Sequence, residues 1–285
     1  MSRPSPRLSV VTITYNDAAG LRATLDSLQP LWQAWPPAEW EHVVVDGSPD
    51  VDRPLLSDLP EGWPLLSLER PPRGVAHAFN HALTAARGRY IWFLNGGDRL
   101  RRLDALARAV AILEDEVGLD LVCGGAYLTR HGAPLYPTAP RRRFVANILG
   151  RSWMYHQAVI YRRTSLARIG AFSTSYRATA DYDYHIRCYV AGLRGRFIRD
   201  VLVDYDMTGG SNDVATVFDE LKRIQRSHRR ELPAWVNGVN EVVRSIEYRR
   251  IQLLRTVSAT PLGTGLRSVW TTLNRRVRAS LARRP

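Results

Sequence analysis

The stretch G-R-Y-I-W-F-L-N-G-G-D, residues 88–98, decides the predicted fold. Its apolar run from Tyr90 to Leu94 is typical of a strand that is buried on both faces. The turn Asn95-Gly96-Gly97-Asp98 follows at once, so the strand delivers polar groups to the edge of a sheet. Two glycines let the backbone approach a bulky anion closely, and a carboxylate there can bind the divalent cation that holds a phosphate group. Taken alone, the same residues also fit a plain turn in which Asp98 caps the next helix.

Working outward, apolar strands alternate with helical patterns. The predicted strands are Leu8–Thr14, Glu41–Val45, Leu65–Glu69, Tyr90–Leu94 and Leu119–Cys123, and the predicted helices are Asp17–Leu28, Val75–Ala86 and Leu103–Leu113. This order predicts an α/β domain whose mostly parallel sheet carries helices on both faces.

The pattern loosens after about residue 125. There we expect an exposed loop at Gly132–Arg143, a short strand at Ala158–Tyr161, a helix at Tyr182–Ala191 and a strand at Arg196–Val203. The break Gly209-Gly210-Ser211-Asn212 follows, and the chain beyond it has a helical pattern.

Polar residues directly follow three of the predicted strands. They are Thr14-Tyr15-Asn16-Asp17, Asp46-Gly47-Ser48 and Asn95-Gly96-Gly97-Asp98. Open parallel sheets bind ligands at the carboxyl ends of their strands, so these three turns are the candidate site. Asp46 could accept hydrogen bonds from a base or a ribose, and an Asx turn at Asp46-Gly47-Ser48 is the plainer alternative.

The bulk composition is that of a globular protein. Of the 285 residues, 45% are hydrophobic and 24% charged, and two cysteines are too few for a disulfide framework. No signal peptide is recognisable, and no run reaches the ~18 apolar residues of a membrane span. We therefore expect a cytoplasmic protein, either free or peripheral on the inner face of the cell membrane. Trp32, Trp35, Trp40 and Cys123 are interpreted as packing residues.

Most of the positive charge lies near the C-terminus. The chain carries a net +13, and residues 214–285 hold 15 Lys+Arg against 5 Asp+Glu. We therefore predict a catalytic domain at 1–212 and a basic, amphipathic helical extension at 213–285. Charge confined to the tail disfavours nucleic-acid binding, which predicts basic residues over the folded domain.

Apolar residues recur at helical spacing in this extension. They are Val243, Ile246, Leu253, Leu254 and Val257, and then Leu266, Val269, Trp270, Leu273, Val277 and Leu281. Arginines fill much of the remaining surface. The pattern fits docking on an anionic membrane, and it fits equally well an apolar stripe packed on the catalytic domain.

Six motifs now make a resemblance specific. L-S-V-V-T-I-T-Y-N (8–16), H-V-V-V-D-G-S-P-D (42–50), G-V-A-H-A-F-N-H-A-L (74–83), residues 88–98, H-Q-A-V-I-Y-R-R (156–163) and A-D-Y-D-Y-H-I-R (180–187) occur in that order. Together they resemble the family-2 glycosyltransferases, which have a GT-A fold, over roughly residues 8 to 210. The variant L-N-x-G-D looks like the subgroup with colanic-acid-type and mycobacterial glycolipid transferases.

The resemblance implies roles for individual residues. It assigns the donor's nucleotide and diphosphate to Thr14, Tyr15, Asp46, Gly74, Asn80 and Asn95. It assigns a divalent cation, Mg²⁺ or Mn²⁺, to Asp98, and the general base to Asp181. Four positions depart from the family pattern: Ile13 stands where a proline is common, Asn95 and Gly97 stand where many relatives have aspartates, and Ala180 replaces the Glu of a Glu-Asp pair. Asp98 is therefore the one acidic ligand expected from this motif.

The implied reaction needs a base, because an acceptor hydroxyl is a poor nucleophile until a carboxylate takes its proton. If Asp181 lies opposite the diphosphate, attack inverts the anomeric carbon. Asp183 is two residues on, so on a helix it points to another side and one of the two faces the substrate. Weaker expectations place Asp183 and His156 near the acceptor or a phosphate.

The expected function is thus an inverting glycosyltransferase that uses a nucleotide-diphosphate sugar and a carbohydrate or lipid-linked acceptor, in cell-envelope polysaccharide or glycolipid synthesis. A nucleotidyltransferase would show a Gly-rich loop with a basic residue after the first strand, and a dinucleotide dehydrogenase would show G-x-G-x-x-G. Neither motif is present. A degenerate transferase that binds a nucleotide sugar without turnover stays open, because the acidic motif is thin.

Overall fold

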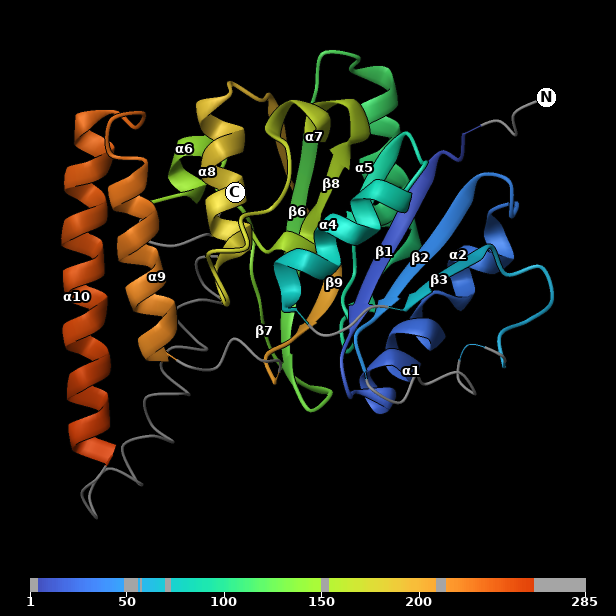
Figure 1. Cartoon of the computed structure of the whole chain (residues 1–285), viewed down its shortest axis with the longest axis horizontal. Helices are drawn as coiled ribbons and strands as arrows, with labels where there is room; N and C mark the ends of the chain where they lie inside the picture. Colours follow the sequence, from blue (N-terminus) through green and yellow to red (C-terminus); the bar gives the residue numbers. More distant parts are fainter. Residues whose placement is uncertain are drawn as a thin grey trace.

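A computed structural model describes residues 5–48, 56, 58–69, 73–149, 154–208 and 214–258 (Figure 1). The predicted break at Gly209–Asn212 and the apolar pattern from Leu266 to Leu281 lie outside these residues. Within them, no helix combines the length and the apolar character that crossing a membrane requires.

One twisted sheet forms the centre of the molecule. Its strands are β1 (Leu8–Thr14), β2 (Trp40–Asp46), β3 (Leu65–Glu69), β4 (Tyr90–Phe93), β5 (Arg99–Leu100), β6 (Leu121–Arg130), β7 (Ala133–Pro137), β8 (Val159–Arg162) and β9 (Gly195–Asp206). They lie in the order β3-β2-β1-β4-β8-β6-β9-β5, and β7 pairs with β6. β1, β2, β3 and β4 run parallel, and β8 lies antiparallel between β4 and β6. The predicted α/β class with a mixed, mostly parallel sheet is confirmed.

Helices cover both faces of this sheet (Figure 1). The helices before β9 are α1 (Ala18–Ser27), α2 (Gln29–Ala34), α4 (Val75–Ala85), α5 (Leu103–Asp115), α6 (Phe144–Asn147), α7 (Arg163–Ile169) and α8 (Ala180–Val190), with the 3-10 turn η1 (His156–Ala158). Successive strand residues point to opposite faces. Val10 and Trp92 therefore pack in one core with α2 and α5, and Val11 and Phe93 pack in a second core with α4, α7 and α8.

The chain after β9 forms α9 (Val214–Ser227) and α10 (Ala234–Ser258). A third apolar cluster joins the start of this segment to α6 and α8; its buried members are Ile148, Tyr182, Ile186, Leu221, Ile224, Leu232 and Val236. The described start of the extension therefore shares a core with α8. The boundary at 212/213 stays a prediction.

Two sequence predictions differ from the structure at β6 and β7. Gly132–Arg143, expected as an exposed loop, contains β7, which pairs antiparallel with β6. Its prolines obscured the strand, but an edge strand tolerates proline because one side has no ladder to complete. The strand expected at Leu119–Cys123 runs from Leu121 to Arg130, because it gains β7 and β9 as partners.

The tryptophan and cysteine interpretations are confirmed. Trp40 is fully buried and packs edge-on against Trp63, while Trp32 stacks on the same ring. Cys123 is buried in the core beneath α4 and α8.

Candidate active site

The ends of β1 and β2 meet at one edge of the sheet. In the parallel register Thr14 lies beside Asp46, and Gly47 N donates to Thr14 O across 3.0 Å. Asp46 is buried, and its Oδ1 accepts from Ser48 N at 2.8 Å, which is the Asx turn that the sequence offered as an alternative. Tyr15 points outward and is 55% exposed, so it can stack against a ligand at this edge.

The turn after β4 is held against the same edge. Gly96 N donates to Ile13 O at 3.0 Å, and a Cβ on Gly96 would lie 3.2 Å from Thr14 Oγ1. Gly97 has φ +94°, a backbone conformation that residues other than glycine rarely adopt. The buried Thr24 of α1 fixes the turn, because its Oγ1 accepts from Gly97 N at 3.0 Å and donates to Asp98 O at 2.7 Å. The turn therefore requires glycine at 97, and glycine at 96 avoids crowding Thr14.

Two polar atoms at this edge lack an internal partner. Thr14 Oγ1 and Asn95 Oδ1 are buried and have no hydrogen-bond partner among the described residues. Buried polar atoms are almost always paired, so unpaired ones mark places where a ligand or water completes the hydrogen bonding. Both residues were predicted to contact the donor.

Asp98, the last residue of the turn after β4, is buried at this edge of the sheet and is 3% exposed. Its Oδ1 accepts from Asp206 N at 2.9 Å, at the end of β9. Burial raises the pKa of Asp98 to about 8; hydrogen bonds from Asp206 N and the Gln157 side chain oppose the rise, and the charge of Asp206 adds to it. An ionised Asp98 at neutral pH therefore calls for a nearby cation.

Asp206 and Gln157 were not anticipated from the sequence. They lie far from Asp98 along the chain and meet it only because β9 and η1 end at this edge. Among the described residues, no group of three or more His, Cys, Asp or Glu side chains could hold a metal ion alone. A cation beside Asp98 would therefore draw most of its ligands from a bound molecule and water.

Of the two residues near α4 that were predicted to bind the sugar donor, Gly74 lies at the exposed start of the helix and Asn80 is held by backbone. Gly74 stands at the start of α4 with φ +96°, and the first helical residue, Val75, is 45% exposed. Asn80 instead binds backbone: its Nδ2 donates to Phe172 O at 2.9 Å and its Oδ1 accepts from Phe172 N at 2.7 Å. Asn80 therefore ties α4 to the segment that precedes α8.

Two aspartates in the first turn of α8 have different surroundings. Asp183 is buried; its oxygens accept from Arg187 Nε at 2.8 Å and contact Nε2 of His228, which directly follows α9, at 2.9 Å. Asp181 is partly buried and its Oδ1 accepts from Tyr182 N at 2.8 Å. Tyr161 of β8 lies within electrostatic range of Asp181. The two side chains thus point to different sides, and Asp183 joins α8 to α9.

The pKa of Asp181 is raised to about 6. Burial is the largest cause, the backbone N–H groups of Tyr182 and Asp181 oppose it, and the charge of Glu220 adds a smaller increase. A carboxylate with such a pKa is ionised at neutral pH and is a better proton acceptor than an ordinary aspartate.

His156 lies beneath the site, in an aromatic cluster. Its ring is 4.4 Å from that of Phe93 and 4.9 Å from that of Phe79, measured between centroids. Neither ring nitrogen has a hydrogen-bond partner among the described residues, and burial lowers its pKa well below the ordinary value. His156 is therefore neutral, and its predicted contact with acceptor or phosphate stays a prediction.

Known proteins share both the sequence pattern and this architecture. The family model described as "Glycosyl transferase family 2" matches residues 9–177. A "PGL/p-HBAD biosynthesis glycosyltransferase" of Mycobacterium bovis (strain BCG / Pasteur 1173P2) is 31% identical over 235 residues, covering 79% of this chain and 86% of the relative.

Two solved structures share the fold at low sequence identity. S. aureus TarS 1-349 in complex with UDP-GlcNAc is 20% identical with a TM-score of 0.63, over 79% of this chain and 66% of that one. This chain spans 39% of a longer TarS chain. The mannosyltransferase PcManGT of Pyrobaculum calidifontis, in complex with GDP-Man and Mn2+, is 19% identical with a TM-score of 0.61, over 98% and 84%. The predicted GT-A fold is confirmed.

The two aspartates of α8 should have opposite effects on stability at pH 7.5. Asp181→Asn is expected to raise the free energy of unfolding by about 1–2 kcal/mol, because it removes a carboxylate whose folded-state pKa is raised. Asp183→Asn is expected to lower it by about 2 kcal/mol, because Arg187 and His228 lose a buried partner. Denaturant unfolding measures both.

The pH dependence provides a control. A raised folded-state pKa costs stability as pH rises through about 6, so the gain from Asp181→Asn should shrink as the pH falls from 7.5 toward 4. Changes of the same sign in the two variants would contradict this account of α8.

Proposed function

Because the chain belongs to glycosyl transferase family 2 and is a glycosyltransferase, we propose a specific reaction for it. It transfers a sugar from a nucleotide-diphosphate donor to an acceptor hydroxyl, with inversion at the anomeric carbon. The observation that carries the proposal is the single sheet edge at which Thr14, Asp46 and the turn Asn95–Asp98 meet.

The donor's nucleotide lies at this edge in the proposal. Asp46 accepts hydrogen bonds from the base or ribose, and Tyr15 stacks against the base. The unpaired Thr14 Oγ1 and Asn95 Oδ1 support the proposal, because donor polar groups would complete their hydrogen bonding. Gly74 at the start of α4 lets the chain pass close to the diphosphate. UDP-GlcNAc and GDP-Man in the two related structures make both nucleotides candidates.

A divalent cation, Mg²⁺ or Mn²⁺, lies beside the buried Asp98 at this edge of the sheet in the proposal. Asp98 and its neighbour Asp206 offer oxygen ligands, and the raised pKa of Asp98 reflects a buried carboxylate that a cation would favour in its ionised form. Such a cation, when bound, stabilises charge on the diphosphate leaving group. The Mn2+ complex of PcManGT agrees with this choice.

Asp181 acts as the general base in the proposed reaction. Its carboxylate takes the proton of the acceptor hydroxyl as the acceptor oxygen bonds to the anomeric carbon. The bond from that carbon to the diphosphate breaks on the opposite face, and its electron pair leaves with the nucleoside diphosphate. The pKa of about 6 supports this role, because the group is ionised and basic at neutral pH.

We further propose a cytoplasmic enzyme of cell-envelope polysaccharide or glycolipid synthesis that docks on an anionic membrane to reach a lipid-linked acceptor. The names of relatives support the pathway: one is called a PGL/p-HBAD biosynthesis glycosyltransferase, and a partial match in Bacillus subtilis is called a putative teichuronic acid biosynthesis glycosyltransferase.

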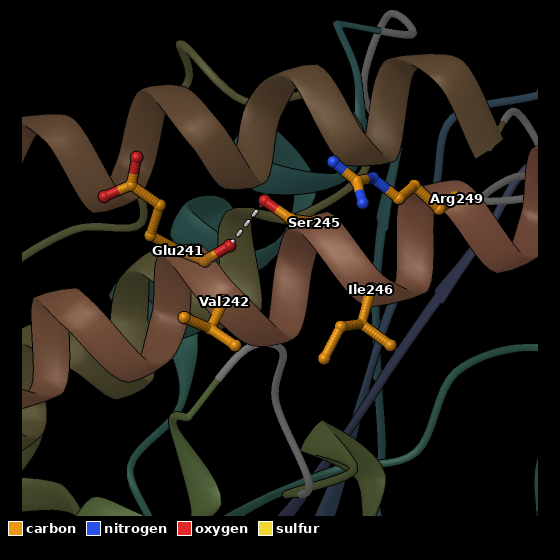
Figure 2. A pocket seen from close by; sticks show the side chains of 5 residues that line it. All are labelled: Glu241, Val242, Ser245, Ile246 and Arg249. Atoms are coloured by element: carbon orange, nitrogen blue, oxygen red, sulfur yellow. Dashed lines mark hydrogen bonds between the residues drawn. The ribbon is translucent and has the colours of Figure 1, made fainter.

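The outer face of α10 supports the membrane proposal. Four exposed apolar residues recur at helical spacing, namely Trp235, Val239, Val242 and Ile246. Figure 2 shows Val242 and Ile246 projecting together from one side of α10, beside a surface pocket that they share with Glu241, Ser245 and Arg249. Residues 214–285 carry a net +10, which is complementary to anionic lipid.

Donor binding should depend on a divalent cation and on Asp98. Calorimetric titration of UDP-, GDP- and dTDP-sugars, with and without Mn²⁺, is expected to show metal-dependent binding of one nucleotide class. Asp98→Ala should weaken it at least tenfold, because the cation loses its buried carboxylate. Asp104→Ala, at an exposed aspartate of α5, is the matched control and should bind normally. Equal binding with and without metal would contradict the cation site.

The pH profile of kcat/KM for sugar transfer should fall on its acidic side, with a midpoint near pH 6. Below this pH Asp181 is protonated and cannot accept the acceptor's proton, so kcat/KM should fall about tenfold per pH unit. Asp181→Asn should lower nucleotide release from the donor by about 10²–10⁴-fold and leave donor affinity within twofold of the wild type. An active Asp181→Asn enzyme would reject the assignment, and a wild type that binds donor without turnover would indicate a degenerate transferase.

Vesicle flotation, which measures the fraction of protein bound to lipid, tests the membrane proposal. The wild type should float with phosphatidylglycerol-containing vesicles at low salt and much less at 0.5 M NaCl, because salt screens the attraction to anionic lipid. Trp235→Glu/Val242→Glu should lower the bound fraction several-fold. Val117→Glu, at an isolated residue that is 80% exposed, is the control. Flotation that is absent, or unaffected by the double variant, would contradict docking through α10.

A further inference from the structure

Glu220 of α9 is a buried carboxylate with an unusual set of partners. Its side chain is 5% exposed, and it accepts hydrogen bonds from three successive backbone N–H groups. The donors are Arg177 N at 2.6 Å, Ala178 N at 2.9 Å and Thr179 N at 3.0 Å, and Thr179 Oγ1 adds a fourth bond at 2.9 Å. One side chain thus holds the whole turn that leads into α8.

Glu220 bonds to the residues that lead into α8, not to the N–H groups of the helix's own first turn. Thr179 is the N-cap residue of α8, yet its side chain makes no capping bond to α8 and donates to Glu220 instead. A carboxylate near the start of a helix also lies in the favourable field of the helix dipole. The hydrogen bonds that fix the entry into α8 therefore come from a residue of α9, 41–43 positions further along the chain.

We propose that Glu220 is a positioning residue for the transfer reaction, because it fixes the turn 177–179 and with it the first turn of α8, which presents Asp181 to the acceptor. This inference rests on the proposed role of Asp181 as the general base. It makes α9, in the predicted extension, a working part of the active site.

The surrounding packing restricts how the turn could move. Leu221 and Ile224, next to Glu220 on α9, pack in one cluster with Tyr182 and Ile186 of α8. Gln225 Nε2 donates to Tyr182 Oη at 3.2 Å. With the two helices joined in this way, loss of the Glu220 carboxylate frees the turn 177–179 without separating α8 from α9.

The charge of Glu220 has a second effect on Asp181. The N–H groups at the start of α8 favour an ionised Asp181, and the negative charge of Glu220 opposes them. Among the other groups near Asp181, Tyr161 stays neutral because burial raises its pKa, and His185 of α8 stays neutral because burial lowers its pKa to about 3.

The remaining charges of this region lie around Asp183. Arg187 of α8 and His228, directly after α9, both contact Asp183, and the Asp183 hydrogen bond raises the pKa of His228. His228 also contacts Glu231, and Arg177 is the first residue of the turn 177–179. Of the groups around Asp181, Glu220 is the one that both contacts the turn and adds to the pKa of Asp181.

The test is the titration of Asp181 in the full-length protein labelled with ¹³C at aspartate carboxyl carbons. Comparison with Asp181→Asn identifies the resonance. We expect a midpoint near pH 6 in the wild type, lowered by about one pH unit in Glu220→Gln, because this variant removes a negative charge that raises the pKa of Asp181. At an effective dielectric constant of about 20, one unit corresponds to a unit charge about 12 Å away. Gln225→Met, which removes another α8–α9 hydrogen bond, should leave the midpoint unchanged.

Glu220→Asp keeps the charge on a shorter side chain. It should retain a midpoint within a few tenths of a unit of the wild type while kcat for nucleotide release falls at least tenfold and KM for the donor stays constant. Glu220→Asp also tests the inference if Glu220→Gln does not fold. An unchanged midpoint in folded Glu220→Gln, or full kcat in Glu220→Asp, would overturn the inference.

These readouts separate this inference from the proposed function. The carboxyl titration needs neither donor nor acceptor, so it reports on Glu220 even if the wild type turns over no nucleotide sugar. A midpoint that shifts in Glu220→Gln, in a protein whose Asp181→Asn variant is fully active, would establish the Glu220–Asp181 coupling, reject Asp181 as the base, and so overturn the catalytic part of the inference.

Discussion

The parallel register of β1 with its two neighbours is the constraint on which the rest of this structure depends. Backbone hydrogen bonds place Thr14 beside Asp46 and Val11 beside Phe93, and Gly96 N bonds to Ile13 O, so the segments that follow the three strands reach the same edge. The polar turns that follow them must then share one edge. Gly96 permits the closest approach, because a Cβ there would crowd Thr14. A slip of one residue would turn every buried side chain of β1 to the other face, which the two apolar cores prevent.

The carboxylates at low exposure in this structure are in two contrasting states. Asp183, Glu41 and Glu220 are buried with full sets of hydrogen-bond donors, and they serve as joints between elements. Asp98 is also buried and Asp181 is partly buried, but desolvation outweighs their hydrogen bonds and raises the pKa of each. Carboxylates that are costly to ionise in the free protein are those that gain most from a cation or from an acceptor's proton. This contrast separates the proposed catalytic groups from the structural ones.

Much of the fold was predictable from local patterns, because buried strands and amphipathic helices have distinct periods. The strand ends, the placement of Asp98 and the divergence of Asp181 from Asp183 follow from those periods. Asp206 and Glu220 were not predictable, since each reaches its partner from a distant element and no local motif surrounds it. Gln157 lies in the motif at 156–163, but that motif does not indicate its contact with Asp98. The loop expected at Gly132–Arg143 was wrong at β7, where pairing with β6 outweighs the local preference of prolines. The roles of the site residues remain proposals.

Manganese anomalous scattering from crystals grown with the preferred nucleotide sugar and Mn²⁺ tests the proposed donor edge most directly. The account predicts one strong anomalous peak within coordination distance of the Asp98 carboxylate. It also predicts the donor diphosphate on the other side of the ion and the nucleotide along Thr14 and Asp46. A nucleotide bound elsewhere, or a manganese ion that does not contact Asp98, would contradict it.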